Sequence, residues 1–225
     1  MKYLGLILAS IFILNVNAYA QTPSKKMMEL EDICLSLRNG MGSERSVTQG
    51  YHKLDAFQKR NPFVYTESDI ELISGAEYEV PLEGHMIYIP QYFKTLLETK
   101  DGVFKKGEEL LDEWNKLHKV DNRGLGHCFR QHHFAIKANS SMTFRINVSR
   151  GLSDLLVVAE PNAFVTMKVY DATANVHLIA QEDLADEKTG KPSRRKTMKF
   201  DKKTSLNVTV SNVSSKDASM ALFWF

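Results

Sequence analysis

Apolar and polar residues alternate through much of the second half of the chain. From Met142 to Val148 every second residue is apolar, and the stretch from Leu206 to Val210 repeats the pattern. A period of two is typical of strands with one buried face, because neighbouring side chains of a strand point to opposite sides. Turn residues such as Asn, Gly and Pro separate segments of this kind. We expect eight strands, near residues 133–138, 142–148, 154–159, 164–170, 176–180, 196–200, 204–210 and 218–224.

Two of these expected strands have no polar face. Residues 155–159 and 218–225 are apolar at nearly every position. A strand of this composition has to be covered on both sides. We therefore expect both to lie at the centre of a sheet or beneath the rest of the chain.

The first half of the chain follows a helical period instead. Leu30, Ile33, Cys34 and Leu37 fall on one face of a helix expected over 24–38, which the Asn39-Gly40 pair ends. Similar apolar stripes predict further helices over 46–59, 90–101 and 106–120. Between them we expect a short turn at 66–73 and a small hairpin formed by 77–82 and 85–89.

The period changes at residues 121–126, where two glycines and a polar run separate the two halves. We therefore expect an α+β fold with a mainly helical region over 21–126 that contains one small hairpin. A C-terminal antiparallel β-sandwich, jelly-roll-like and of about eight strands, is expected over 127–225.

Short motifs in the expected sandwich resemble a known family. They are Ala159-Glu160-Pro161, the run from Val165 to Asp171, Phe200, the run from Leu206 to Asn212, and the closing run from Ala218 to Leu222. Together they resemble the bacterial prepeptidase C-terminal type of β-sandwich. That resemblance implies an accessory module for secretion, stability or binding, of the kind appended to secreted hydrolases. Here no recognisable catalytic domain precedes the module, and the whole layout also resembles small uncharacterised exported proteins of Gram-negative bacteria.

The first twenty residues have the pattern of an export signal. Lys2 precedes an apolar run from Leu4 to Val16, and Ala18-Tyr19-Ala20 forms a small-x-small cleavage site. The apolar run is too short for a comfortable membrane span, and no second run follows, so we expect no transmembrane segment after cleavage. The mature protein is expected in the periplasm or outside the cell.

The charge balance and the motifs reduce the number of possible functions. The chain has 29 basic and 27 acidic residues, a balance that excludes the basic footprint of a nucleic-acid-binding protein. It contains no Gly-x-Ser-x-Gly elbow and no phosphate-binding glycine loop. We expect a non-enzymatic binding or assembly protein without a cofactor, whose partner is a cell-surface glycan or another exported protein. The alternative is a secreted hydrolase that combines His85 or His127 with a carboxylate in a crevice between the two halves.

Two cysteines, Cys34 and Cys128, remain after cleavage of the signal. In an oxidising compartment an even pair predicts a disulfide, which here would join the first helix to the start of the strand region. Two buried, inert thiols are the alternative.

The segment that contains Cys128 also holds three histidines. His127, His132 and His133 with a cysteine thiolate have the ligand types of a tetrahedral zinc site. Their spacing matches no common ligand pair, and the adjacent His132 and His133 would point apart on a strand. We therefore expect no metal site and keep these histidines only as weak candidates.

A basic run ends the charged insertion at 183–196. Arg194, Arg195 and Lys196 are the candidates for binding an anionic partner such as a polysaccharide or a lipid headgroup. The favoured alternative is a solvated loop whose like charges repel one another. Tyr88, Tyr92 and Phe93 have the composition of a sugar platform, although a core between helix and hairpin is the preferred interpretation.

Overall fold

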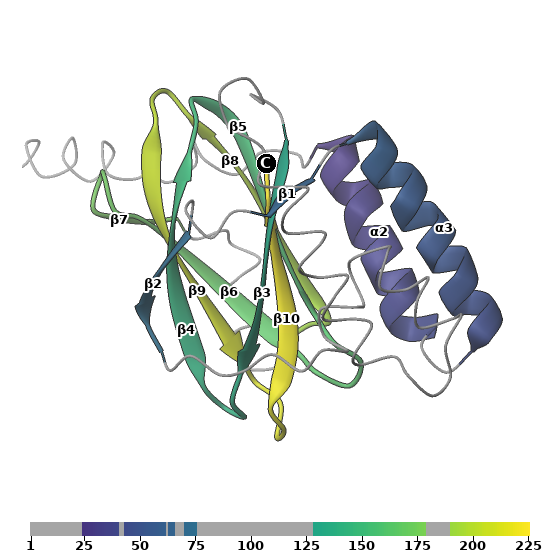
Figure 1. Ribbon diagram of the computed structural model, residues 1–225. Helices are drawn as coiled ribbons and strands as arrows, with labels where there is room; N and C mark the ends of the chain where they lie inside the picture. Colours follow the sequence, from purple (N-terminus) through teal and green to yellow (C-terminus); the bar gives the residue numbers. More distant parts are fainter. Residues whose placement is uncertain (1–23, 41–42, 62, 66–69, 76–127, 179–189) are drawn as a thin grey trace, which may run out of the picture.

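The computed structural model describes residues 24–40, 43–61, 63–65, 70–75, 128–178 and 190–225. Within these residues the chain forms two helices and two five-stranded sheets, which confirms the α+β class (Figure 1). The expected signal segment, the hairpin at 77–89, the two helices between 90 and 120 and the hinge at 121–126 lie outside the described residues.

Sheet A has the strand order β1-β3-β10-β5-β8, and sheet B has the order β2-β4-β9-β6-β7. The strands of sheet A are β1 (Phe63–Tyr65), β3 (Phe129–Ile136), β10 (Ala218–Trp224), β5 (Gly151–Ala159) and β8 (Ser193–Phe200). Those of sheet B are β2 (Ile70–Ser74), β4 (Ser141–Val148), β9 (Thr204–Asn212), β6 (Val165–Asp171) and β7 (Val176–Leu178). Neighbouring strands are antiparallel, except that β1 runs parallel to β3.

All eight expected strands are present, as β3 to β10, although β8 begins at Ser193 and not at residue 196. Strand β9 shows how the alternation works: Leu206, Val208 and Val210 are buried, whereas the residues between them are half exposed. The buried residues of β9 and β4 join those of sheet A in one apolar core between the two sheets. The expected turns are present as well, because Asn139 and Asn162 adopt the positive φ angles that such turns need.

Strands β5 and β10 are buried on both faces, as their composition predicts. In β5, Leu155 and Val157 face the core between the sheets, whereas Leu156 and Val158 face the opposite way. Strand β10 divides in the same manner, with Leu222 on one side and Phe223 on the other. The second apolar core lies between sheet A and the helices.

Helices α2 (Lys25–Gly40) and α3 (Glu44–Arg60) form a hairpin on the outer face of sheet A (Figure 1). Both helices lie where the sequence predicts them, at 24–38 and 46–59, within two residues at each end. Helix α2 buries its apolar stripe against sheet A, with Leu30 and Leu37 fully inaccessible to solvent. The two helices cross closely at Gly50, where an added Cβ atom would lie 2.3 Å from Cδ2 of Leu37.

The first half also contributes a strand to the edge of each sheet. The prediction of a turn at 66–73 is wrong for the residues that the structure describes, because Ile70–Ser74 forms β2 and pairs with β4. Ile70 and Leu72 are partly buried against the core between the sheets, so alternate burial and not a helical cap determines the local structure. Strand β1 was not expected, since three residues are too few to show a period. No helix in the described part of the chain is long and apolar enough to cross a bilayer.

Candidate functional site

The basic run lies in a strand and not in a solvated loop. Arg194, Arg195 and Lys196 belong to β8, where their register partners on β5 are Val157, Leu156 and Leu155 respectively. Arg194 and Lys196 are only 9% and 8% exposed, and Nε of Arg194 donates a hydrogen bond to the carbonyl oxygen of Val165. The loop interpretation is therefore wrong, and the three residues do not form one exposed cationic surface.

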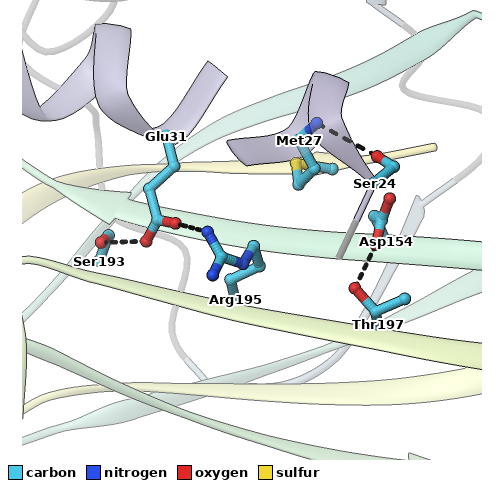
Figure 2. A network of polar contacts seen from close by, with 7 residues as sticks. All are labelled: Ser24, Met27, Glu31, Asp154, Ser193, Arg195 and Thr197. Atoms are coloured by element: carbon cyan, nitrogen blue, oxygen red, sulfur yellow. Dashed lines mark hydrogen bonds and ion pairs between the residues drawn. The ribbon is translucent and has the colours of Figure 1, made fainter. Parts of the chain in front are cut away.

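Arg195 instead connects sheet A to helix α2. Its guanidinium forms an ion pair with Glu31, whose other carboxylate oxygen accepts a hydrogen bond of 2.7 Å from the Ser193 hydroxyl (Figure 2). The side chains of Glu31 and Arg195 are 15% and 27% exposed, so water screens this pair only in part. Both oxygens of Glu31 are thus occupied by strand β8.

A second polar contact lies further along the same two strands. Thr197 donates a hydrogen bond to the buried carboxylate of Asp154, its partner in the register between β8 and β5 (Figure 2). Nearby, the Ser24 hydroxyl accepts a hydrogen bond of 3.2 Å from the amide of Met27 at the start of α2. We define Glu31, Ser193, Arg195, Asp154 and Thr197 as the polar seam between α2 and sheet A.

Arg38 connects the C-terminal end of α2 to sheet A. Its guanidinium donates hydrogen bonds to the carbonyl oxygens of Ala159, Glu160 and Ala163 at 3.2, 3.2 and 2.8 Å. It also lies 5.8 Å from the centroid of the Phe164 ring, a cation–π distance. These contacts connect the helix to the turn between β5 and β6. Arg38 and the polar seam therefore have a structural role, since their charged groups bind other residues of the fold.

The expected disulfide between Cys34 and Cys128 is not formed, and both cysteines are free, buried thiols. Cys34 is fully inaccessible and packs among the apolar residues between α2 and sheet A. Burial raises the pKa of the Cys34 thiol, and the nearby charge of Glu31 raises it further. The thiol stays protonated at neutral pH and is a poor nucleophile and metal ligand.

The histidine candidates are not brought together. His132 and His133 lie on opposite faces of β3, because His132 is 5.3 Å from Phe144 in the core between the sheets while its neighbour points the other way. His127 lies outside the described residues. Among the residues that the structure describes, no three His, Cys, Asp or Glu side chains are grouped as metal ligands. His132 and His133 therefore cannot bind the same ion.

The contact between the helices and sheet A has an apolar centre, with Leu30, Phe57, Leu156 and Phe223 fully buried in it. His85 and His127, the residues named for the alternative hydrolase site, are outside the described residues, as are Tyr88, Tyr92 and Phe93.

A groove of about 570 Å³ lies on the helical hairpin itself, lined by Lys25, Met28, Glu29, Asp32, Ile33, Lys53, Ala56 and Arg60. Glu29 and Arg60 pair with each other at 2.6 Å across it.

The outer face of sheet B presents polar side chains along β4 and β9. On β4 and β9 every outward residue is polar, and all of them are exposed or half exposed: Ser141, Thr143, Arg145, Asn147, Ser205, Asn207, Thr209 and Ser211. We call this set the polar ladder. The alternation of the sequence marks its members as the polar half of each strand, but only the register shows which of them are neighbours.

Cross-strand hydrogen bonds order the polar ladder. The hydroxyls of Ser141 and Ser211 are 2.7 Å apart, those of Thr143 and Thr209 are 2.9 Å apart, and Nε of Arg145 donates to Oδ1 of Asn207 at 3.2 Å. Each pair is opposite in the register of β4 and β9. These hydrogen bonds place the side chains of the two strands next to one another in pairs.

Two further strands extend the polar ladder sideways. On β6, Lys168 lies opposite Thr209 and Tyr170 lies opposite Asn207. On the other side Glu71 of β2 forms an ion pair of 3.3 Å with Arg145. The resulting surface offers hydroxyl, amide and guanidinium groups beside one aromatic ring, with little net charge at its centre.

No family model matches the chain, and no curated protein matches its sequence. Among solved structures the chain is similar to PliG, a periplasmic lysozyme inhibitor of g-type lysozyme from Aeromonas hydrophila, with 9% identity and a TM-score of 0.30 over 43% of this chain and 83% of the inhibitor. A family GH115 4-O-methyl-α-glucuronidase has 10% identity and a TM-score of 0.27, and the match spans 84% of this chain but only 33% of that enzyme. A carbohydrate-binding module solved with β-1,4-galactotriose has 11% identity and a TM-score of 0.22 over 43% of this chain and 87% of the module. Likenesses at this level carry no argument about what the chain does.

Proposed function

We propose that this protein is an exported, non-enzymatic binding protein that holds a polysaccharide on the polar ladder of a jelly-roll β-sandwich. Export rests on the signal pattern of the first twenty residues. The observation that carries the binding function is the polar ladder, in which hydrogen-bonding side chains repeat along two neighbouring strands.

The jelly-roll architecture is supported by the strand order. From β3 to β10 the chain changes sheets at every step except between β6 and β7, which gives β3-β10-β5-β8 in one sheet and β4-β9-β6-β7 in the other. Two four-stranded sheets with this alternation are typical of jelly rolls, an architecture that lectin domains use. Function does not follow from architecture, so the proposal depends on the surface.

The chemistry of the polar ladder favours a polysaccharide over a protein. Protein interfaces have an apolar centre, whereas the outward residues of β4 and β9 include no apolar side chain. Hydroxyl and amide groups can donate to and accept from the hydroxyls of a sugar. The Tyr170 ring beside Asn207 adds an apolar surface of the size of one sugar ring.

Affinity electrophoresis with a panel of soluble neutral and acidic polysaccharides tests this proposal. We expect at least one of them to retard the wild-type protein. The variant Arg145→Ala/Asn207→Ala should bind at least about tenfold more weakly, because two hydrogen-bonding groups are lost from the centre of the polar ladder. The matched control is Ser215→Ala/Lys216→Ala, which changes two exposed residues of the connection between β9 and β10.

Three results would contradict the proposal. They are no retardation by any polysaccharide, equal retardation of the wild type and the ladder variant, and release of new reducing ends from the bound polysaccharide. The last result would replace the binding protein with an enzyme. Far-UV circular dichroism of each variant excludes loss of the fold as the cause of weaker binding.

A further inference from the structure

One end of the two sheets collects exposed positive charge. Arg150 lies between β4 and β5, Lys202 and Lys203 lie between β8 and β9, and Lys199 lies near the end of β8. All four are exposed, and Asp201 is the acidic residue among them. We call these four cations the basic end. Its net charge exceeds that of the whole chain, which is +2.

The register explains why the four cations lie together. Val148 is opposite Thr204 in sheet B, and Gly151 is opposite Phe200 in sheet A. The connections 149–150 and 201–203 therefore cross between the sheets side by side. Gly151 has a φ of 118°, a conformation that favours glycine and lets the first connection turn within two residues.

The four cations of the basic end have no acidic partner among the described residues, whereas several other basic residues of the described chain do. Arg145, Arg195 and Lys59 form ion pairs with Glu71, Glu31 and Asp55 respectively. None of the four cations of the basic end forms an ion pair with a residue that the structure describes. Their charge is available to an external anion.

An exposed apolar residue lies beside these cations. Leu152 is 54% exposed, more than any other large apolar side chain of the described residues. It is the register partner of Lys199, so their side chains are neighbours on the same face of sheet A. An exposed apolar side chain beside several cations suits an anionic lipid surface, because the cations meet headgroups while the apolar chain enters the acyl boundary.

We propose that the basic end docks onto an anionic phospholipid bilayer, with Leu152 inserted between the headgroups. An acidic polysaccharide would use the cations alone and leave Leu152 in water, so the exposed leucine favours the lipid. The proposal does not depend on the polar ladder, which runs along the outer face of sheet B and reaches this end only with Asn147 and Ser205. Each cation near such a surface contributes to binding, and the contribution falls with salt.

Cosedimentation with vesicles of about four parts phosphatidylcholine to one part phosphatidylglycerol, an anionic fraction sufficient to attract basic residues, tests the proposal. We expect the wild-type protein to bind these vesicles, not to bind vesicles of pure phosphatidylcholine, and to dissociate as the salt concentration rises. Lys202→Gln/Lys203→Gln should lower the partition coefficient by about 30-fold, because two surface cations are lost. The matched control, Lys137→Gln/Lys216→Gln, removes two exposed charges from the opposite end and should stay within about twofold of wild type.

The role of Leu152 is tested separately. Leu152→Ser should lower the partition coefficient by about fivefold at constant salt, since an exposed apolar side chain is lost without any change in charge. Ile73→Ser, at a 39% exposed position of β2, is its control and should bind as the wild type does. The proposal is wrong if wild type does not bind the anionic vesicles or if both lysine pairs matter equally. It is also wrong if Leu152→Ser has no effect while a soluble acidic polysaccharide binds the basic end.

Discussion

Burial determines the chemistry of Cys34. The side chain is fully inaccessible between α2 and sheet A, and both the loss of water and the charge of Glu31 raise the pKa of its thiol. Only the thiolate reacts with disulfide reagents. A reagent therefore needs local or global unfolding before it can reach a reactive form of Cys34.

We predict that Cys34 is inert in the folded protein. In the variant Cys128→Ser, the reaction of Cys34 with Ellman's reagent at pH 8 should be at least about 100-fold slower than that of an exposed thiol. An exposed thiol for comparison is supplied by Ser215→Cys in a chain that carries Cys34→Ser and Cys128→Ser. Raising the pH to about 9 should accelerate the exposed thiol and leave Cys34 unreactive, because its pKa is raised. Guanidinium chloride should restore full reactivity, and rapid labelling of native Cys34 would contradict this account.

The sequence predicts which way Cys34 faces but not what lies opposite it. Its helical spacing with Leu30 and Leu37 correctly places it on the buried face of α2. The expected bond to Cys128 relied on the oxidising compartment alone. Whether two cysteines meet depends on the distance between their Cα atoms, which no local pattern contains.

At the scale of elements, helix α2 is attached to sheet A by polar contacts at its middle and near its C-terminal end as well as by its apolar stripe. Glu31 binds β8 near one edge of the sheet, and Arg38 binds three carbonyl groups at the turn between β5 and β6. Apolar burial resists separation of helix and sheet but has little direction. The polar contacts have defined partners and so determine the position of the helix along the sheet.

A double-mutant cycle measures the contribution of the ion pair. We predict a coupling free energy of about 1–2 kcal/mol between Glu31→Gln and Arg195→Gln, because the pair is largely shielded from water. The control cycle, Asp55→Asn with Lys59→Gln, concerns an i, i+4 pair whose lysine is 75% exposed, and it should give less than about 0.5 kcal/mol. Urea unfolding of the single and double variants gives both values. Equal coupling in the two cycles would show that the Glu31 pair acts as an ordinary surface pair.

Periodicity predicts the long elements and fails for the short or highly charged ones. The alternation in β4 and β9 and the apolar stripe of α2 each repeat several times along the sequence, so these three elements are predicted at the correct positions. Strand β1 has three residues and exists through its pairing with β3. In β8 the charged residues at 194–196 hide the alternation, because arginine and lysine can bury their stems while their charged groups bind neighbours.

At the scale of the whole molecule, sheet A is the layer shared by two apolar cores. Its inner face packs against sheet B, and its outer face packs against α2 and α3. The strands at its centre, β5 and β10, contribute to both cores at once. Sheet B is covered by described elements on one face only, and the residues of the polar ladder on its other face are exposed or half exposed.

This layering predicts the order of amide hydrogen exchange. Backbone amides of β10 and β5 should exchange last, because both cores must open to release them. Amides of β2 and β7, which lie at the edges of sheet B, should exchange first among the strands. Hydrogen exchange followed by mass spectrometry resolves these segments, and exchange of β10 as fast as that of β7 would contradict the layering.

The polar ladder and the basic end could not be predicted from the sequence, because both depend on which strands become neighbours. The alternation identifies Arg145 and Asn207 as outward residues, yet these positions are far apart in the chain and become neighbours only through the register of β4 and β9. Arg150 and Lys203 are brought together in the same way by two neighbouring strand pairs. Long-range register follows from the packing of the whole core, and a local pattern does not contain it.

The central place of β10 has a consequence for how the chain acquires its structure as it emerges from the ribosome. Strands β3 and β5 become neighbours in sheet A only through β10, which pairs with both. Until residues 218–224 have been synthesised, β3 and β5 lack their common partner and each apolar core lacks part of its wall. Folding of the nascent chain therefore has to wait for residues 218–224, and truncation before Ala218 is expected to give a chain that is degraded or aggregates instead of a smaller stable protein.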